Sequence, residues 1–259
     1  MANRRPKARQ GIQSIEVGAT LLRALARASG PLMLRDLAAA AHMPAAKAHR
    51  YLVSLVRMGM VEQNAETGLY DLGAFALNLG LSAVARLEPV TVATPFLEAL
   101  REKTGQTVAL AVWANQGATI VRWLGADTPV AASLRVGSVM PLTRSATGRV
   151  FLSFLPRQAT ERRIKDELLD NERKNLDPRV IGQVEQVIRT TRGLGYAHTS
   201  DFIPGIAGAA APVFDHTAAL SMALIVLGYS KPFDAALTDI AAALLRESLA
   251  LSQRLGWQS

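Results

Sequence analysis

Residues 43–72 join a short basic amphipathic helix directly to a hairpin, and this order of elements strongly restricts the fold. Pro44 suits the first turn of a helix, where a missing N–H costs nothing, and Gly59 ends the helical pattern. One face repeats apolar residues at helical spacing, namely Ala48, Leu52 and Leu55. Another face is polar and mostly cationic, with Lys47, Arg50, Ser54 and Arg57. We therefore expect one side of this helix in a core and the other facing a charged partner.

The segment that follows the basic helix has the pattern of a β-hairpin. Two short runs with apolar residues, 60–63 and 69–72, flank the polar loop 64–68. The loop ends in Gly68, and glycine accepts the positive φ that such turns need. A two-stranded wing is therefore expected next to the helix.

Two further helices are predicted upstream of the basic helix. Residues 14–29 have a helical pattern, with Ser14 as the expected N-cap and Gly30 at the stop. Its expected apolar stripe consists of Ile15, Leu21, Leu22, Leu25 and Ala26. An alanine-rich run from Leu34 predicts a second, short helix, because alanine favours helices and allows close packing.

Three short helices followed by a hairpin predict a winged helix-turn-helix. The third helix is slim enough for the major groove of DNA, where a cationic face meets phosphates and base edges. The expected DNA-contacting residues are Ala45, Ala46, Lys47, His49, Arg50, Ser54 and Arg57. His49 taken alone fits an ordinary solvated helix face better, whereas the whole arrangement favours double-stranded DNA as the partner.

The charge is concentrated in the first third of the chain. Residues 1–86 contain 11 Lys and Arg against 5 Asp and Glu, whereas residues 87–259 contain 18 against 16. This imbalance indicates a polyanion-binding module, preceded by a basic, solvated tail over residues 1–10. The chain has no cysteine, which excludes disulfides and suits a reducing compartment. No apolar run reaches about 18 residues, so we expect no membrane partner and a cytoplasmic, nucleoid-associated location.

The rest of the chain predicts a linker helix and then an α+β domain. Residues 72–88 form an apolar helix pattern limited by Pro89, which suits packing against a neighbour; a merely buried helix is the alternative. Further helices are expected before Gly105, over 145–155, 161–169 and 177–193, and from Phe233. Strands are expected over 107–115, 117–125, 206–214 and 219–228. Strands covered by helices make an α+β domain.

Four stretches of this sequence resemble the IclR family of bacterial transcriptional regulators: residues 11–25, 43–72, 140–156 and 195–215. The resemblance implies two domains, with a winged helix-turn-helix over 11–72, a linker helix over 73–88 and an effector-binding domain over 89–259. It further implies that the second domain is a GAF-like antiparallel sheet with helices. A homodimer or homotetramer on palindromic operator DNA, acting as a ligand-responsive repressor, is the expected form.

The resemblance also implies an effector site between a helix start and the sheet. The matching positions are Ala146, Thr147, Thr199 or Ser200, Gly208, Ile225 and Leu227. Family members that bind glyoxylate or pyruvate carry Asp, Cys, Ser and Ser at the last four of these positions. All four polar anchors differ here, which puts a two-carbon or three-carbon acid in doubt.

Apolar residues at these positions favour an aromatic or otherwise apolar effector. Ile225 and Leu227 lie two apart in a strand and share one face, so with Gly208 we expect a wider, apolar pocket. A ring gains more from such walls than a small acid does, at about 25 cal/mol per Å² buried. Backbone N–H groups at residues 145–147 could still hold an acidic group. Trp113, Trp123 and His198 are further lining candidates. The alternatives are a small carboxylate such as pyruvate, or a closed site whose residues are simply core.

Enzymatic chemistry is not expected. The sequence has no G-x-S-x-G, P-loop, G-x-G-x-x-G or H-E-x-x-H motif. The four histidines lack metal-ligand spacing, and no base is placed beside Ser221 or Ser230 by spacing. We therefore expect no cofactor and no metal, and an enzyme of GAF-like fold is the remote alternative.

Overall fold

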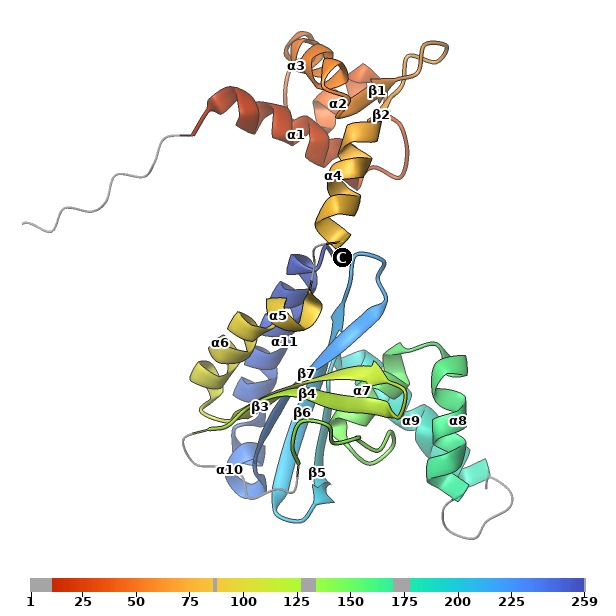
Figure 1. Ribbon diagram of the computed structural model, residues 1–259, viewed down its shortest axis with the longest axis vertical. Helices are drawn as coiled ribbons and strands as arrows, with labels where there is room; N and C mark the ends of the chain where they lie inside the picture. Colours follow the sequence, from red (N-terminus) through yellow and green to blue (C-terminus); the bar gives the residue numbers. More distant parts are fainter. Residues whose placement is uncertain (1–10, 86–87, 127–133, 170–177, 259) are drawn as a thin grey trace, which may run out of the picture. The chain divides into compact units, whose positions relative to one another are not determined.

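The computed structural model describes residues 11–85, 88–126, 134–169 and 178–258, and it divides into two compact units (Figure 1). The first unit ends at Leu87 and the second begins at Glu88. Each unit has its own hydrophobic core or cores. The basic tail expected over residues 1–10 lies outside the described residues.

The first unit is a three-helix bundle with a two-stranded wing. Its elements are α1 (Gln13–Arg27), α2 (Leu34–Ala40), α3 (Ala45–Arg57), β1 (Val61–Gln63), β2 (Tyr70–Leu72) and α4 (Ala74–Ala85). One buried leucine from each of the first three helices meets the strands in a common core, namely Leu21, Leu37 and Leu52. This is the winged helix-turn-helix that the sequence predicted.

The turn residues on either side of the wing are the ones the sequence indicated. Gly59 ends α3 with φ +69° and Gly68 closes the loop with φ +71°, values that residues with a Cβ rarely adopt. The Asn64 side chain accepts the backbone N–H groups of Glu66 and Thr67, both at 2.9 Å. These contacts shape the loop and fix the register of β1 against β2.

The beginning of α1 differs from the prediction. The helix starts at Gln13, with Ile12 in the N-cap position and no side-chain cap, so Ser14 is not the N-cap. Ile15 is 66% exposed and Ala26 is also exposed, whereas Leu21 and Leu25 are buried. The predicted stripe was too broad, because the first turn of α1 is exposed and Ala26 lies on the outward side of the helix.

The second unit contains one five-stranded sheet with helices on both faces. Its elements are α5 (Pro89–Val92), α6 (Thr94–Thr104), β3 (Thr107–Ala114), β4 (Gly117–Leu124), α7 (Ala146–Phe154), α8 (Arg157–Leu169), α9 (Pro178–Leu194), β5 (Ala197–Ile203), β6 (Ile206–Phe214), β7 (Leu220–Tyr229), α10 (Ser230–Ala235) and α11 (Leu237–Arg254). The strand order is β4-β3-β7-β6-β5, and every neighbouring pair is antiparallel. The unit is therefore the α+β domain that the sequence predicted.

Alternate residues of the strands face two separate cores. Val108, Leu110, Leu224 and Val226 pack under α6 and α11, and we call this side the α6–α11 face. Ala109, Ala111, Ala223, Ile225 and Leu227 pack with α7, and we call this side the α7 face. Figure 1 shows α6 and α11 on one side of the sheet and α7 on the other.

Strand β5 was not predicted. The sequence of Ala197–Ile203 mixes polar, charged and apolar residues without a regular alternation. The strand lies at the edge of the sheet and pairs only with β6 among the described strands. Edge strands carry polar residues more readily than central ones, which explains why periodicity alone missed it.

Helix α4 carries an unusual amount of exposed apolar surface. Four of its large side chains are exposed, namely Phe75, Leu77, Leu79 and Leu81. At 12 residues it is short, and no helix in the described ranges is long and apolar enough to cross a membrane. The apolar character predicted for residues 72–88 is therefore seen on the surface of the first unit.

Candidate DNA-binding surface and ligand cavity

The outer face of α3 displays the residues predicted to contact DNA. Ala45, Ala46, His49, Arg50, Ser54 and Arg57 are exposed, and Lys47 is half-buried. The opposite face, with Ala48, Leu52 and Leu55, is buried in the core of the first unit. The helix therefore presents small and cationic side chains outward while its apolar stripe holds it in place.

The cations of α3 are available to an external partner. Lys47, Arg50 and Arg57 form no ion pair with a carboxylate in the part of the chain that the structure describes. The helix itself contains no Asp or Glu. An unpaired row of cations on a slim, exposed helix is suited to the phosphates and base edges of a duplex.

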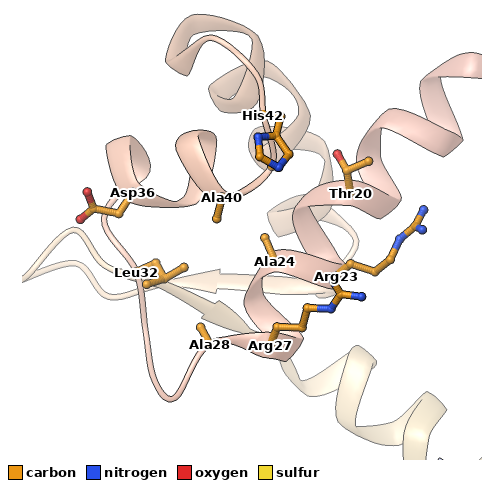
Figure 2. A pocket seen from close by; sticks show the side chains of 10 residues that line it. Thr20, Arg23, Ala24, Arg27, Ala28, Leu32, Asp36, Ala40 and His42 are labelled. Carbon is orange, nitrogen blue, oxygen red and sulfur yellow. The ribbon is translucent and has the colours of Figure 1, made fainter. Parts of the chain in front are cut away.

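A separate open groove lies between α1 and α2. Its volume is about 510 Å³, and Figure 2 shows Arg23 and Arg27 extending from α1 at its border. His42, which has a positive φ of 52°, lies at one end of it. None of the residues predicted to contact DNA lines this groove, so it is distinct from the exposed face of α3.

In the second unit, a small cavity lies on the α7 face. Three of its lining residues form one row across neighbouring strands, because Thr199 pairs with Gly208 and Gly208 pairs with Leu227. Ile225 lies two residues before Leu227 on the same face. The structure thus brings together Ala146, Thr147, Thr199, Gly208, Ile225 and Leu227, all taken from the predicted set.

The start of α7 forms the polar end of this ligand cavity. The Ser145 hydroxyl caps the helix by accepting the Gly148 N–H at 2.9 Å. The N–H groups of Ala146 and Thr147 have no partner within the helix, as is general for a first turn. The Thr147 side chain is 1% exposed, lines the cavity, and forms no hydrogen bond with any residue that the structure describes. This end of the cavity can therefore receive a polar group.

The cavity is apolar, as expected, but it is not wide. Its free volume is about 20 Å³, which is room for about one water molecule. A Cβ added to Gly208 would lie 3.0 Å from the Leu227 Cδ2 atom, so the Leu227 side chain occupies the space that glycine leaves. The predicted wider pocket is wrong for this state, because apolar interiors close to high packing density when nothing fills them.

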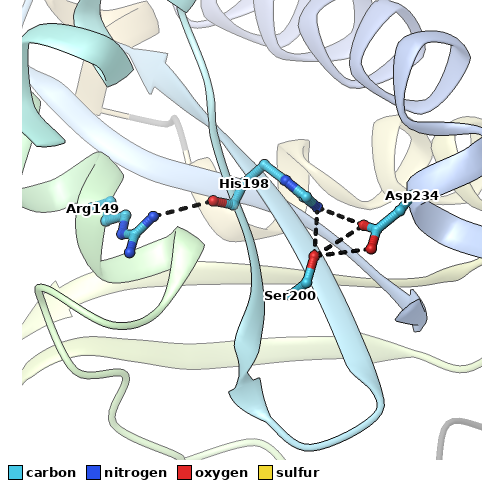
Figure 3. Close-up of polar contacts among 4 residues, drawn as sticks. All are labelled: Arg149, His198, Ser200 and Asp234. Atoms are coloured by element: carbon cyan, nitrogen blue, oxygen red, sulfur yellow. Dashed lines mark hydrogen bonds and ion pairs between the residues drawn. The ribbon is translucent and has the colours of Figure 1, made fainter. Parts of the chain in front are cut away.

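His198 and Ser200 do not line the cavity. Strand alternation turns them away from Thr199, and Figure 3 shows both side chains meeting Asp234 of α10. The His198 Nε2 atom lies 2.9 Å from Asp234 Oδ1, and the Ser200 hydroxyl donates to the same carboxylate at 3.0 Å. The ring of His198 also stacks on Phe233.

The His198, Ser200 and Asp234 side chains do not form a catalytic triad. In a triad the base uses one ring nitrogen for the nucleophile and the other for the carboxylate. Here the serine hydroxyl and the aspartate approach the same nitrogen, and the hydroxyl also donates to the aspartate. The arrangement joins β5 to α10, and it gives the serine no base to activate it.

The two tryptophans belong to the α7 face without reaching the cavity. Trp113 packs against Phe151 with ring centroids 5.8 Å apart, and Trp123 contacts the same core. Several further residues line the cavity without having been predicted as lining residues, namely Leu134, Met140, Ser145, Phe202, Ile203, Ile206 and Ala207. Ser145 was expected only to offer its backbone N–H, and Ile206 and Ala207 lie in the predicted strand β6. Leu134 and Met140 lie in the loop before α7, and an irregularity in β5 places Phe202 and Ile203, so periodicity does not reveal them.

A carboxylate from α8 holds the loop that leads into α7. Glu167 accepts the N–H groups of Leu142 at 2.6 Å and Thr143 at 3.0 Å, and also the Thr143 hydroxyl. The same loop contributes Met140 and Ser145 to the cavity wall. Glu167 therefore fixes one wall of the cavity. No three His, Asp or Glu side chains of the described ranges are grouped as a metal site.

Two family models match the chain. The model "IclR helix-turn-helix domain" matches residues 14–65, and the model "Bacterial transcriptional regulator IclR C-terminal" matches residues 81–253. The first match covers α1 from Ser14, α2, α3 and β1, and it ends in the loop of the wing. The second covers the sheet and both of its faces.

Two curated proteins and one solved structure show the similarity, one of the proteins over about half of this chain and the others over most of it. The glycerol operon regulatory protein of Streptomyces griseus is 31% identical over 95% of this chain and 98% of its own length. The acetate operon repressor of Salmonella typhimurium is 32% identical over 56% of this chain and 53% of its own. The crystal structure of Pseudomonas aeruginosa HmgR has a TM-score of 0.87 and 35% identity, and the match covers 96% of this chain and 100% of that one.

Proposed function

The chain belongs to the IclR family of bacterial transcriptional regulators. We therefore propose that it is a ligand-responsive repressor that binds operator DNA through α3. Its relatives are transcriptional regulators and not enzymes. The relatives named above are a glycerol operon protein and an acetate operon repressor, so their names do not give the effector of this chain. Operator DNA places the protein in the cytoplasm, at the nucleoid.

The observation that carries the DNA-binding role is the exposed, unpaired cationic face of α3. Phosphate contacts supply affinity for any duplex, whereas base-edge contacts supply specificity. Arg50 lies in the second turn of α3, behind the small residues Ala45 and Ala46. That position suits a side chain that reaches a base edge once the helix start enters the major groove.

The test uses a duplex selected from a random pool by the purified protein. Arg50→Ala should weaken binding to the selected duplex by about 1–3 kcal/mol and leave binding to mixed-sequence DNA less affected. Arg23→Ala is the matched control, because Arg23 is exposed on α1 and borders the groove of Figure 2. Equal losses on both duplexes would make Arg50 a phosphate contact. Unchanged affinity for both would remove it from the interface.

The ligand cavity on the α7 face is the proposed effector site. Its apolar walls and its polar end at Ala146 and Thr147 support an aromatic or otherwise apolar effector that can carry an acidic group. The free volume of about 20 Å³ requires side chains such as Leu227 to move when a ring enters. Ligand would then select an open state that the empty protein populates little. Pyruvate is the second candidate, because the small volume needs the least opening for it.

A thermal-shift panel on the full chain distinguishes these effectors. The panel contains pyruvate, glyoxylate, benzoate and benzyl alcohol. A ligand at 100 times its dissociation constant should stabilise the protein by ~2.7 kcal/mol. Stabilisation by aromatics alone supports the apolar site. Stabilisation by pyruvate or glyoxylate alone would show that the N–H groups of α7 dominate and would overturn the aromatic assignment.

The exposed leucines of α4 are the surface on which we propose that a second copy of the chain packs. A helix that is apolar on most sides is normally buried, and Leu77 and Leu81 are more than half exposed in the single chain. We assign α4 (Ala74–Ala85) to a linker helix that pairs in a homodimer or homotetramer. Leu77→Lys should shift sedimentation of the protein toward the monomer. A monomeric wild-type protein would contradict this assignment.

Two-fold pairing fixes the spacing between the DNA half-sites that the protein can bind. A ligand that changes the pairing of the two DNA-binding units therefore changes operator affinity without touching α3. The direction expected for a repressor is release of DNA. A selected duplex that is bound more tightly in the presence of the effector would make the protein a ligand-dependent activator or co-repressed regulator instead.

A further inference from the structure

Arg144 and Phe202 meet at the edge of the ligand cavity. The Phe202 side chain lines the cavity, and the Arg144 guanidinium carbon lies 5.9 Å from the centre of its ring. Arg144 immediately precedes Ser145, the N-cap of α7, and it is exposed. A cation is therefore held beside the polar end of an otherwise apolar cavity, on an aromatic ring that forms part of the cavity wall.

An irregularity in β5 brings Phe202 to this position. Thr199 pairs with Gly208 and Ile203 pairs with Ile206, so three residues of β5 lie opposite one residue of β6. In a regular strand Phe202 would face away from Thr199. The bulge instead allows Thr199, Phe202 and Ile203 all to line the cavity. Bulges commonly redirect side chains in this way beside binding sites.

No residue that the structure describes neutralises the charge on Arg144. Arg144 forms no ion pair and no side-chain hydrogen bond with any described residue, and its guanidinium carbon lies over the ring of Phe202. Glu167, which reaches the same loop, is already occupied by the N–H groups of Leu142 and Thr143. The neighbouring cation Arg149 donates to the Thr143 and His198 carbonyl oxygens. Arg144 is thus left to pair with an anion from outside.

We propose that the effector is an aromatic carboxylic acid whose carboxylate pairs with Arg144 at the start of α7 while Phe202 covers its ring. This inference rests on the proposed role of the cavity as the effector site. A guanidinium held only by a half-buried ring is held weakly, whereas a bidentate carboxylate pair is a strong, oriented contact. The ligand therefore draws Arg144 from Phe202, and the freed ring can pack on the ligand. The N–H groups of Ala146 and Thr147 and the Thr147 hydroxyl complete the carboxylate site.

The test is isothermal titration of the full chain with acids and their neutral partners. The probes are benzoate, 4-hydroxybenzoate and phenylacetate, each paired with the corresponding alcohol. Arg144→Gln should raise the dissociation constant of the acids about tenfold to a hundredfold, as expected for a lost hydrogen bond to a charged group. The same variant should change the values for the alcohols less than about twofold. Arg122→Gln is the matched control, because Arg122 is exposed on β4, at the opposite edge of the sheet from β5.

The outcomes separate this inference from the proposed function. If the acids bind Arg144→Gln as well as the wild type, or if the alcohols bind the wild type as tightly as the acids, the ligand carboxylate does not pair with Arg144. The proposed apolar effector site would be unaffected by that result. If no aromatic probe binds the wild type at millimolar concentration, both fall. Phe202→Leu adds a second test: it should weaken acids and alcohols alike, and an unchanged affinity for both would remove Phe202 from the site.

Discussion

The two faces of the five-stranded sheet are built from the same strands, and on β3 they differ in the size of their side chains. Val108 and Leu110 face α6 and α11, while Ala109 and Ala111 face α7. On β7, Leu224 lies on the α6–α11 face and its neighbour Ala223 on the α7 face, although Leu227 also faces α7. At the centre of the sheet, large strand residues therefore fill the α6–α11 face, and small ones leave room on the α7 face for α7 and its preceding loop.

This difference suits the α6–α11 face to stabilising the fold and the α7 face to binding a ligand. On the α6–α11 face, long helices contribute residues such as Leu97 and Leu244, both fully buried. On the α7 face, the small strand residues let α7 and its preceding loop approach closely, and there the ligand cavity is found. A face that must open for a ligand cannot also be the most tightly filled one. Substitutions on the two faces should therefore differ in effect, most of all at buried leucines.

Leu244→Ala and Leu227→Ala make the same chemical change on opposite faces. Leu244 is fully buried under the sheet, so its loss should destabilise the protein by about 2–5 kcal/mol. Leu227 borders the ligand cavity and is 7% exposed, so its loss should lie at the lower end of that range. Urea unfolding of both variants measures the difference. Equal losses in the free energy of unfolding would mean that the α7 face is packed as tightly as the α6–α11 face.

Leu227→Ala should also change ligand binding. Removing the side chain that fills the space beside Gly208 enlarges the cavity and removes part of the opening cost for a ring. Aromatic probes should therefore bind this variant more tightly than they bind the wild type, whereas Leu244→Ala should leave their affinity unchanged. Weaker binding by the Leu227 variant would show that its side chain contacts the ligand directly.

Gly148→Ala tests how closely α7 approaches its preceding loop. An added Cβ would collide with the backbone of Pro141 and Leu142, which cannot move aside as a flexible side chain could. We expect a loss of about 1–3 kcal/mol in the free energy of unfolding. Gly182→Ala is the matched control, because Gly182 is an exposed helical glycine with open space around it. The control should be neutral or stabilising, by up to about 1 kcal/mol.

The parts of the molecule that follow a local period could be predicted from the sequence. The basic face of α3, the glycines of the wing and the strands β6 and β7 are all indicated by residues a few positions apart. The position of Gly208 beside Leu227 followed from the family resemblance. Periodicity could not reveal β5, because its mixed residues lie at a sheet edge.

Local sequence patterns also could not predict whether the cavity is open or closed, for a different reason. Whether an apolar pocket is open depends on how surrounding side chains pack, and here Leu227 closes the space beside Gly208. The placement of Phe202 depends on a bulge that is defined only by pairing with β6. Likewise, Ser200 was the alternative to Thr199 in the family resemblance and His198 was a further lining candidate, whereas strand alternation directs both to Asp234.

Gly208→Ala should affect ligand binding more than stability. The added methyl would lie 3.0 Å from a Leu227 methyl group, and that side chain can shift by the few tenths of an ångström required. The free energy of unfolding should change by less than about 1 kcal/mol. The ring-sized opening should become harder, so the affinity for aromatic probes should fall about tenfold or more. Unchanged affinity would place the effector elsewhere on the α7 face.

The smallest effect is expected in the turn between β6 and β7, whose residues belong to neither hydrophobic core. Burial by itself raises the pKa of Asp215, but it is outweighed by hydrogen bonds from the Thr217 hydroxyl and N–H and from the Ala219 N–H, which hold the pKa below its ordinary value of 3.8. The charged form therefore contributes stability above pH 3.8, and this contribution is lost as the pH falls through the lower pKa of the folded state.

Asp215→Asn should consequently cost less than about 0.5 kcal/mol near neutral pH, because the carboxylate is partly in water. The difference from the wild type should shrink as acid protonates Asp215 in the wild-type protein. Urea unfolding at several pH values measures it. Since the turn belongs to neither face, the variant should leave the affinity for aromatic probes unchanged. In the Asp215→Asn background, Leu244→Ala and Leu227→Ala should still differ in the free energy of unfolding by the same amount. A change in either would mean that the two faces communicate through this turn and are not independent layers.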